Sequence, residues 1–467
     1  MSMLVYNHIL AADSYKPSHQ FVYPENVVGL FSYGEARKLG HTIIPFGMQM
    51  WLKKFLSIPV TYEMIDEAEE ILTLHGEPFD RKPWEKIITH YDGFLPLTIR
   101  SVKEGTPMPS GHPIFTCECT DPDLFWLASY IETNMQRAIW YPTTVASQGY
   151  ATKQILKAAY EKTGADVAMI PFALHDFGAR GTTCAEQAEI GGLAHLVNFK
   201  GTDTLEALRA GRAYYNEKMA GFSVPATEHS IECSYGKEPE QELEYLRTVL
   251  RKLGKPGKVV SAVIDGYDVM RAALAICVDL HDEIIESGVK FVFRPDSGDM
   301  NTIVPEILDM QAKYFGYTVN EAGYKKIKHV GLLQGDGINP ESLKELLDII
   351  IEKGYAADNI VFGSGGALLQ KVNRDTFSFA MKASAKLVNG KWVGVKKEPI
   401  TDSGKNSKAG RLTVAKYKDE FVTLDAGNWP ITFVESIYDK VMEVVYDHGK
   451  ILVNDTFETI RNRTEGK

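Results

Sequence analysis

The sequence predicts an α/β protein whose central part is a parallel sheet closed into a (β/α) barrel. Six apolar, strand-like runs recur between residues 168 and 366, and helical patterns separate most of them. Strands that alternate with helices form parallel sheets through right-handed crossovers. Most of the runs also end in charged or glycine-bounded groups. Functional side chains are expected there, because barrels and open α/β sheets both place their sites at the carboxyl ends of the strands.

The runs follow one another at spacings that suit strand–helix units. In chain order they are AMIPFALH (168–175), GFSVPATEH (221–229), KVVSAVID (258–265), VKFVFRPD (289–296), HVGLLQGD (329–336) and NIVFGSGG (359–366). The helix before the last run has the clearest signals: Asn339 is a good N-cap and Pro340 suits the first helical position. Apolar residues then recur at i, i+3, i+4 and i+7 from Leu343 to Ile350, and Gly354 is a stop signal. This helix should lay its leucine face on the sheet.

The last run ends in a glycine-rich turn formed by Gly363, Ser364, Gly365 and Gly366. Glycines permit positive φ and bring bare N–H groups close to an anion, and a following helix would point its positive end at the same place. We therefore predict a phosphate cradle, although a plain tight turn has the same composition. Barrels commonly hold a phosphate at the last strand–helix unit, which favours a closed barrel over the alternative, an open doubly wound sheet.

The two flanks of the chain differ in character from the central part. We predict that residues 1–150 and 385–467 form one companion domain packed on a barrel of residues 151–384. The N-terminal part is aromatic-rich and less regular, whereas short alternating runs after residue 385 indicate hairpins, with turn signals at Asn389, Gly390, His448 and Gly449. The basic segment 401–411 suits either a solvated loop or a clamp on a ligand.

Composition restricts the classes of partner. The chain of 467 residues is 44% hydrophobic and 24% charged, which is ordinary for a soluble globular protein. Its net charge of −10 argues against general nucleic-acid binding, so a phosphate site must be built from local cations. No apolar run approaches the roughly 20 residues of a membrane span, and the N-terminus lacks the pattern of a signal peptide. We expect no membrane partner and a cytoplasmic location.

The cysteines indicate reduced thiols. There are five of them, an odd number scattered along a large chain, which suits mostly buried and unpaired side chains. Cys117 and Cys119 form a C-x-C pair that a strand would turn to one face, but no adjacent histidine or further cysteine completes a metal site. We do not expect a metal there.

The residues after the strand-like runs point to a phosphorylated ligand. They are His175, Asp176 and Arg180; Glu228 and His229; Asp265; Arg294 and Asp296; and Gly335 and Asp336. Carboxylates such as Asp296 and Asp336 can hold a hydrated Mg²⁺ or ribose hydroxyls. The arginines at 180, 294 and 374 can each bind a phosphate group through two parallel hydrogen bonds. Together with the glycine-rich turn, these groups favour a sugar-phosphate ligand.

His229 is the candidate nucleophile or proton carrier of this group. Neighbours on a strand face opposite ways, so Glu228 cannot easily orient the His229 ring, and Asp265 at the end of the next run is better placed. A histidine with a purely structural role is the alternative.

Several of these motifs together resemble the nicotinamide phosphoribosyltransferases of bacterial or phage type. They are DSYKPSH (13–19), HDFGARG (175–181), HLVNFKGTD (195–203), VPATEHS (224–230), FRPDSG (293–298), QGDG (334–337) and FGSGG (362–366). The resemblance implies the type II phosphoribosyltransferase fold, an incomplete α/β barrel in a homodimer with shared active sites. It also implies a reaction of NAD salvage: nicotinamide and phosphoribosyl pyrophosphate give nicotinamide mononucleotide and pyrophosphate. ATP, hydrolysed through a phosphohistidine, would assist as co-substrate with Mg²⁺.

The resemblance implies a role for each matching residue. Phe177 and Tyr15 of the partner subunit would sandwich the pyridine ring, and Asp203 would accept the carboxamide NH₂. Arg294 would lie near the ring, and Asp296 would hold ribose hydroxyls. His229 would be phosphorylated, flanked by Glu228 and Asp265. The other implied substrate-binding residues are Ser261, Gly335, Asp336, Gly365 and Gly366.

Binding of the phosphate groups and of Mg²⁺ is implied in the same way. Arg180 would act together with cations of the partner subunit, namely Arg37, Arg374, Lys382, Lys397 and Lys405. Asp265 and Asp296 are the implied Mg²⁺ ligands. The family has a hydroxyl two residues before Lys382, where this chain has Ala380. One phosphate contact is therefore in question.

Three other functions fit parts of this pattern. A nicotinate phosphoribosyltransferase shares the fold and the histidine, but an ionised Asp203 would repel the carboxylate of nicotinate. A sugar-phosphate aldolase or isomerase would need a Schiff-base lysine or a Glu/His pair without cations for pyrophosphate. A non-catalytic binding protein would need neither the charged strand ends nor the glycine-rich turn.

Overall fold

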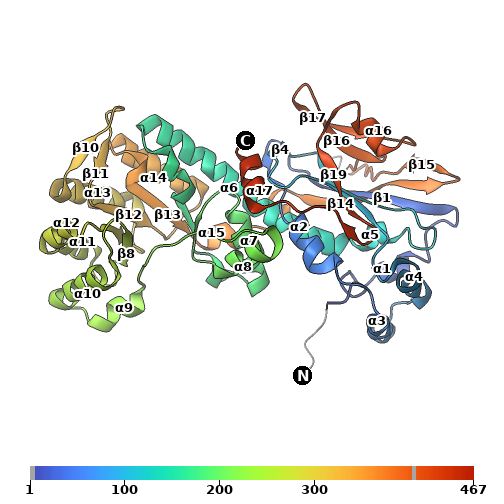
Figure 1. Ribbon diagram of the computed structural model, residues 1–467, viewed down its shortest axis with the longest axis horizontal. Coiled ribbons are helices and arrows are strands. Elements are labelled where there is room, and N and C mark those ends of the chain that lie inside the picture. The colour runs from blue at the N-terminus through green and yellow to red at the C-terminus, as the bar shows by residue number, and fades with distance from the viewer. Residues whose placement is uncertain (1–5, 402–405) are drawn as a thin grey trace. The chain divides into compact units, whose positions relative to one another are not determined.

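The computed structural model describes residues 6–401 and 406–467, which form two compact units (Figure 1). Unit 1 comprises Met1–Ser147, Gly211–Glu217 and Asn373–Lys467, and unit 2 comprises Gln148–Ala210 and Lys218–Val372. Both ends of the chain thus belong to unit 1. Within the described residues, no helix has the length and apolar character needed to cross a membrane.

Unit 2 is built on a parallel sheet with the strand order β7-β6-β13-β12-β9-β8. Its strands are β6 (Leu174–Asp176), β7 (Gly201–Thr202), β8 (Val259–Val263), β9 (Lys290–Arg294), β12 (Val330–Gln334) and β13 (Ile360–Ser364). All the pairings within it are parallel. The first strand, β6, pairs with the last, β13, which is the order of a barrel and not of a doubly wound sheet. The predicted fold class is confirmed.

The barrel is incomplete between β7 and β8. The segment 222–226 crosses this gap with isolated bridges, from Phe222 to Gly201 and from Ala226 to Ser261. The Pro225 carbonyl accepts a hydrogen bond from the Ser261 N–H at 3.0 Å. The prediction of a strand over 221–229 was wrong, because Pro225 has no N–H to donate and the segment stays extended without a ladder.

Two other local predictions also need correction. Most of the run 168–175 is a 3₁₀ helix, η2 (Val167–Phe172), which Asp166 caps through the Ala168 N–H and which contains Pro171. Only the end of that run enters the sheet as β6. Strand β7 was not predicted, because two residues are too short to show any alternation.

Helices connect most of the strands and cover the sheet. They are α7 (Ala185–His195), α8 (Leu205–Tyr215), α9 (His229–Tyr235), α10 (Pro239–Leu253), α11 (Val269–Asp279), α12 (His281–Ser287), α13 (Met300–Phe315), α14 (Pro340–Glu352) and α15 (Gly366–Leu369). Short elements are η3 (Ala179–Gly181), η4 (Ala357–Asn359), β10 (Tyr317–Val319) and β11 (Lys325–Ile327). Helix α14 confirms its prediction, since Asn339 caps the Glu341 and Ser342 N–H groups and the leucine face is buried.

Unit 1 is built on an antiparallel sheet with the order β15-β14-β1-β5-β3-β19-β20. Its strands are β1 (Val27–Ala36), β3 (Thr98–Val102), β5 (Pro113–Cys119), β14 (Phe379–Val388), β15 (Lys391–Gly394), β19 (Met442–Asp447) and β20 (Lys450–Ile451). The blue N-terminal and orange C-terminal strands lie side by side in Figure 1, where β1 pairs with β14. Both predicted hairpins are confirmed, and the two residues of each turn have positive φ.

The remaining elements belong to unit 1, except that helix α6 (Glu132–Thr163) continues into unit 2 from Gln148. The strands are β2 (Thr42–Ile43), β4 (Met108–Pro109), β16 (Leu412–Tyr417), β17 (Glu420–Asp425) and β18 (Asp439–Lys440). The helices are α1 (Lys16–His19), α2 (Met48–Trp51), η1 (Leu52–Leu56), α3 (Tyr62–His75), α4 (Arg81–Tyr91), α5 (Leu127–Tyr130), α6 (Glu132–Thr163), η5 (Arg374–Thr376), α16 (Ile431–Glu435) and α17 (Phe457–Thr464). Cys117 and Cys119 are buried, unpaired thiols on β5.

A buried acid in unit 1 makes stability depend on pH. Glu104 is 5% exposed, and its carboxylate accepts hydrogen bonds from the Gln49 N–H at 3.0 Å and the Tyr215 hydroxyl at 3.3 Å. Burial raises the pKa of Glu104 from 4.5 to about 7. The folded state therefore binds a proton more tightly than the unfolded state, and the free energy of unfolding falls as pH rises through this window.

Glu104→Gln should remove this pH dependence. Relative to the variant, the wild type should lose on the order of 3 kcal/mol of unfolding free energy between pH 4.5 and pH 8. Urea denaturation of both proteins across that range measures the difference. Parallel pH profiles would contradict the assignment.

Candidate active site

Two cavities open at the carboxyl ends of the unit 2 strands and share three residues. The histidine cavity, of about 280 Å³, is lined by Arg180, Glu228, His229, Ser230, Val263, Arg294 and Asp296. The aromatic cavity, of about 410 Å³, is lined by Phe177, Ala179, Arg180, Asp203, Thr204, Arg294, Asp296, Gly335, Asp336 and Gly365. Because Arg180, Arg294 and Asp296 line both, the two cavities adjoin and together form one candidate site.

His229 is held by the carboxylate predicted for it. Its Nε2 lies 3.0 Å from Oδ1 of Asp265, a residue two positions after the end of β8 whose side chain is 3% exposed. The His229 side chain itself is 45% exposed. With Nε2 bonded to Asp265, Nδ1 is the ring nitrogen left to react. His229 is the first residue of α9 rather than the end of a strand, and the adjacent Glu228 accepts from the Ser230 hydroxyl at 2.5 Å.

Thr227 and Tyr245, which were not predicted from the sequence, hold the segment that leads to His229 in place. The Thr227 hydroxyl lies 2.6 Å from the Tyr245 hydroxyl and accepts from the Val263 N–H at 3.1 Å. The Tyr245 hydroxyl donates to the Val263 carbonyl at 3.0 Å. These bonds tie the segment before His229 to the end of β8, which leads into Asp265. A buried hydroxyl of this kind gives no pattern in a sequence.

Glu232 is a second carboxyl beneath the histidine, one turn further along α9. It is 1% exposed, and neither carboxylate oxygen has a hydrogen-bond partner of good geometry among the described residues. Burial raises the pKa of Glu232 to about 7. The carboxyl packs against the Gly266 backbone, next to Asp265, so an added side chain at Gly266 would meet it at 2.5 Å.

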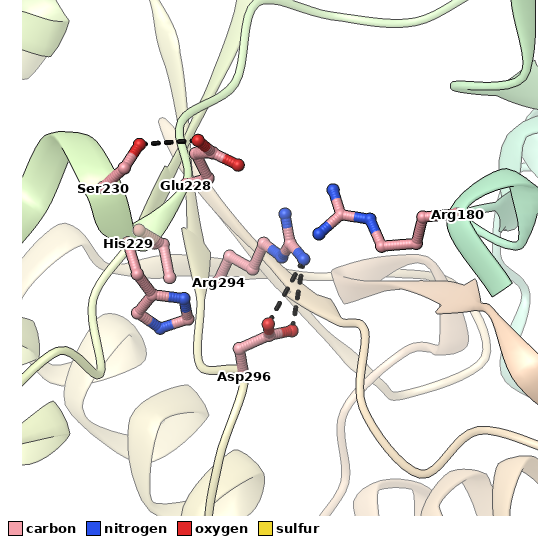
Figure 2. Close-up of a pocket in the computed structure, with 7 residues that line it drawn as sticks. Arg180, Glu228, His229, Ser230, Arg294 and Asp296 are labelled. Carbon is pink, nitrogen blue, oxygen red and sulfur yellow. Dashed lines mark hydrogen bonds and ion pairs between the residues drawn. The ribbon is translucent and has the colours of Figure 1, made fainter.

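Two arginines face each other where the cavities join. Figure 2 shows the guanidinium groups of Arg180 and Arg294 pointing toward one another. Arg294 donates from Nη2 to both oxygens of Asp296 at 3.3 Å, while its buried Nε has no partner among the described residues. Facing cations repel one another unless an anion lies between them, so this junction suits a phosphate group.

Phe177 forms the apolar wall of the aromatic cavity. Its ring lies so close to Gly363 that a Cβ added there would come within 2.0 Å of it. The guanidinium carbon of Arg294 lies 5.1 Å from the ring centroid, within cation–π range. An aromatic wall of this kind suits a flat, aromatic ligand.

The polar wall of the same cavity carries Asp203. Its Oδ1 accepts a hydrogen bond from the Ser223 hydroxyl at 2.7 Å, and its backbone N–H donates to the Asp176 carbonyl at 3.0 Å. The carboxylate is exposed to the cavity and keeps a second oxygen for a ligand. Ser223 lies in the extended segment that crosses the barrel gap, so the sequence pattern did not reveal it.

The glycine-rich turn differs from its prediction in two respects. Gly363, Gly365 and Gly366 do not have positive φ, so conformational freedom is not the reason for glycine. At Gly363 the reason is the Phe177 ring, and at Gly335 it is a tight approach to Asp296. Helix α15 is a single turn of four residues, too short to provide a strong helix dipole. A phosphate here would depend on N–H groups and the neighbouring arginines.

The structure brings most of the predicted unit 2 residues together, with exceptions. His175 and Asp176 line neither site cavity, and His175 lines the same separate cavity as Ser261. Ser261 lines a separate, largely apolar cavity of about 320 Å³ inside the barrel. Gly366 belongs to neither of the two site cavities. Ser261 faces the interior because it lies in the middle of β8, two residues before the carboxyl end of the strand.

Within unit 1, three predicted residues share one neighbourhood. Tyr15, 50% exposed, precedes Lys16, which pairs with Glu132 at 2.8 Å, and Glu132 lies 3.6 Å from Lys382. Arg37 follows β1 and donates to the Ser378 carbonyl, just before the strand that carries Lys382.

Two other predicted cations of unit 1, Arg374 and Lys397, are exposed. Arg374 pairs with Asp375 at 3.4 Å, and the Lys397 N–H donates to the Ser407 hydroxyl at 2.8 Å. Ala380 lies opposite Glu35 on β1. Lys405 lies outside the described residues.

Known proteins match this chain along nearly its whole length. The pattern of the Nicotinate phosphoribosyltransferase (NAPRTase) family matches residues 172–445, and that of the Nicotinamide phosphoribosyltransferase, N-terminal domain, matches residues 7–99. A nicotinamide phosphoribosyltransferase of Xanthomonas campestris pv. campestris (strain 8004) is 43% identical over 464 residues, which are 97% of each chain. The chain belongs to the nicotinamide phosphoribosyltransferase family. This membership makes it an enzyme of the phosphoribosyltransferase class.

A second relative agrees with this assignment, and two solved structures share the fold. A nicotinamide phosphoribosyltransferase of Acinetobacter baylyi (strain ATCC 33305 / BD413 / ADP1) is 31% identical over 496 residues, covering 98% of this chain and 97% of that one. The crystal structure of nicotinate-nucleotide pyrophosphorylase from Pyrococcus furiosus has a TM-score of 0.61 at 16% identity, covering 100% of this chain and 97% of that one. The human nicotinic acid phosphoribosyltransferase structure has a TM-score of 0.57 at 14% identity, with coverages of 98% and 93%. At these identities the two structures support the fold alone.

Proposed function

We propose that this family member transfers the phosphoribosyl group of phosphoribosyl pyrophosphate to nicotinamide, forming nicotinamide mononucleotide and pyrophosphate for NAD salvage. The observation that carries the proposal is the pairing of Phe177 and Asp203 on two walls of one cavity, beside the Arg180 and Arg294 junction. An aromatic wall and a carboxylate suit a flat ring with an amide donor. The names of the two most similar relatives described above support the same substrate.

Asp203 also accounts for the choice between nicotinamide and nicotinate. The Ser223 hydroxyl occupies one face of the carboxylate, and the remaining acceptor capacity suits the NH₂ of a carboxamide. A substrate carboxylate at the same place would meet like charge and lose a hydrogen bond. The cavity therefore favours nicotinamide.

The charges around the junction suit the bond that breaks. As the C1–O bond to pyrophosphate lengthens, positive charge develops on the ribose ring and negative charge on the leaving group. Arg180 and Arg294 can stabilise the leaving group, and Asp296 can hold the ribose hydroxyls. The neutral pyridine nitrogen attacks C1 from its position against Phe177, so much of the rate gain comes from positioning.

Magnesium fits this site as an ion carried by the substrate. Among the described residues, no cluster of three or more candidate side chains could hold a metal by itself. Mg²⁺ commonly binds one or two carboxylates together with substrate phosphates, where it neutralises charge on the leaving group. Asp296 lies at the junction and can serve as a ligand, whereas Asp265 is nearly buried and already bonded to His229.

ATP is proposed to act through His229. Asp265 orients the exposed ring through Nε2, so that Nδ1 can attack the γ-phosphorus of ATP. The bond between this phosphorus and the oxygen that bridges to the β-phosphate then breaks, and ADP leaves. Phosphorylation would add about two negative charges close to Arg294 and Arg180, which could order the loops that bind phosphoribosyl pyrophosphate.

The experiment that tests the proposed reaction compares the two bases. The protein is incubated with phosphoribosyl pyrophosphate, Mg²⁺ and either nicotinamide or nicotinate, with and without ATP, and products are separated against both authentic mononucleotides. We expect nicotinamide mononucleotide and pyrophosphate, formed faster with ATP. Exclusive formation of nicotinate mononucleotide would reject the proposal.

We further propose a homodimer in which Tyr15, Arg37, Arg374, Lys382, Lys397 and Lys405 complete the site of the partner subunit. Mixing inactive Tyr15→Ala and Asp203→Ala subunits should then restore activity, because one of the two sites in each heterodimer inherits neither change. Random exchange should recover about a quarter of wild-type activity. If verified heterodimers stay inactive, each site belongs to a single subunit.

A further inference from the structure

A buried carboxylate is hydrogen-bonded to both of the segments that carry the walls of the aromatic cavity. Asp176 ends β6, is 0% exposed and immediately precedes Phe177. Its Oδ1 accepts from the Gly178 N–H at 2.8 Å, and its Oδ2 accepts from the Thr204 hydroxyl at 2.7 Å. Gly178, which follows Phe177, and Thr204, which follows Asp203, are thus both hydrogen-bonded to the Asp176 carboxylate.

Backbone and hydroxyl contacts strengthen this connection. The Asp203 N–H donates to the Asp176 carbonyl at 3.0 Å, and the Thr202 hydroxyl accepts from the Thr204 N–H at 3.0 Å. Helix α7 closes the carboxylate from outside at Gly192, where an added Cβ would lie 3.2 Å from Oδ2 and 2.9 Å from the Thr204 methyl carbon. The carboxylate is therefore caged and cannot move toward a ligand.

We propose that Asp176 is a positioning residue that sets the separation between the Phe177 ring and the Asp203 carboxylate. The inference rests on the proposed function, in which these two residues hold the base. Burying a carboxylate is costly unless its hydrogen bonds are satisfied, and here both oxygens are used by the two loops that carry the walls. Loss of one of these bonds should loosen the slot for the base and leave the phosphate groups of the site in place.

The test uses two matched variants. Thr204→Val removes the buried hydrogen bond of 2.7 Å from the Thr204 hydroxyl to the Asp176 carboxylate. Thr413→Val removes an equally buried hydrogen bond of 2.7 Å in unit 1, from the Thr413 hydroxyl to the Glu435 carboxylate. Thr204→Ser keeps the hydroxyl and serves as the conservative variant. For each protein we would measure thermal unfolding and the KM values for nicotinamide and for phosphoribosyl pyrophosphate.

We expect Thr204→Val to raise KM for nicotinamide about tenfold, with KM for phosphoribosyl pyrophosphate within about twofold of wild type. Thr204→Ser should resemble wild type, and Thr413→Val should lose similar stability without the KM change. A folded Asp176→Asn protein should show a larger rise in KM for nicotinamide than Thr204→Val, again without a matching rise in KM for phosphoribosyl pyrophosphate. An unchanged nicotinamide KM in folded Thr204→Val, or equal changes in both KM values, would overturn the inference. If the wild type makes no nicotinamide mononucleotide, the proposed function fails instead.

Discussion

His229→Ala should abolish phosphorylation of the protein by ATP and its ATPase activity, while slow synthesis without ATP persists. The expectation follows from the hydrogen bond between the His229 Nε2 and Asp265, which orients the ring. This bond leaves Nδ1 as the free ring nitrogen in the cavity that Arg180 and Arg294 line. The arginines and the aromatic cavity remain in the variant, so positioning of the two substrates is retained. Incubation with γ-labelled ATP should yield an acid-labile, base-stable adduct on the wild type alone.

His281→Ala is the matched control. His281 is also the first residue of a helix and lies 2.8 Å from an aspartate, Asp282, but it lines neither cavity. Its replacement should leave label and turnover unchanged. Absence of label at residue 229 in the wild type, or full ATP-stimulated turnover in His229→Ala, would show that the role given to His229 is wrong even if the transferase reaction stands.

Asp203→Asn should lower the preference for nicotinamide over nicotinate by about tenfold to a hundredfold. The substitution keeps the shape of the side chain and an acceptor for Ser223, but it removes the charge that repels nicotinate and weakens the bond to the carboxamide. The ratio of kcat/KM values for the two bases measures this change. Asp299→Asn removes an equal charge at the exposed N-cap of α13 and should leave the ratio unaltered. Unchanged selectivity in a folded Asp203→Asn protein would refute the assignment.

Those parts of the fold that depend on long hydrophobic patterns were predictable from the sequence. Strands β8, β9, β12 and β13 are apolar runs of ordinary length, and α14 carries both its caps and a leucine face. The elements that were missed or misassigned depend on backbone chemistry that such patterns do not contain. Pro225 keeps a strand-like run out of the sheet, and β7 is too short to show alternation.

Site residues that follow strand-like runs were predictable from the sequence. Site residues whose role depends on contacts with distant parts of the chain were less so. Asp265 was chosen as the partner of His229 because it ends the next apolar run in the chain, and its Oδ1 lies 3.0 Å from the His229 Nε2. Gly363 was predicted as part of a phosphate cradle, whereas the structural reason for a glycine there is the Phe177 ring, which comes from a distant part of the chain. Hydroxyls such as those of Thr227 and Ser223 gain their importance only from partners brought near by folding.

Competition between the two bases tests the central claim most directly. The protein would receive equimolar nicotinamide and nicotinate with limiting phosphoribosyl pyrophosphate, Mg²⁺ and ATP, and the two mononucleotides would be quantified from the same reaction. Their ratio equals the ratio of the two kcat/KM values and needs no separate rate constants. The account predicts at least about a hundredfold excess of nicotinamide mononucleotide, because Asp203 accepts one base and repels the other. Comparable amounts, or an excess of nicotinate mononucleotide, would contradict it.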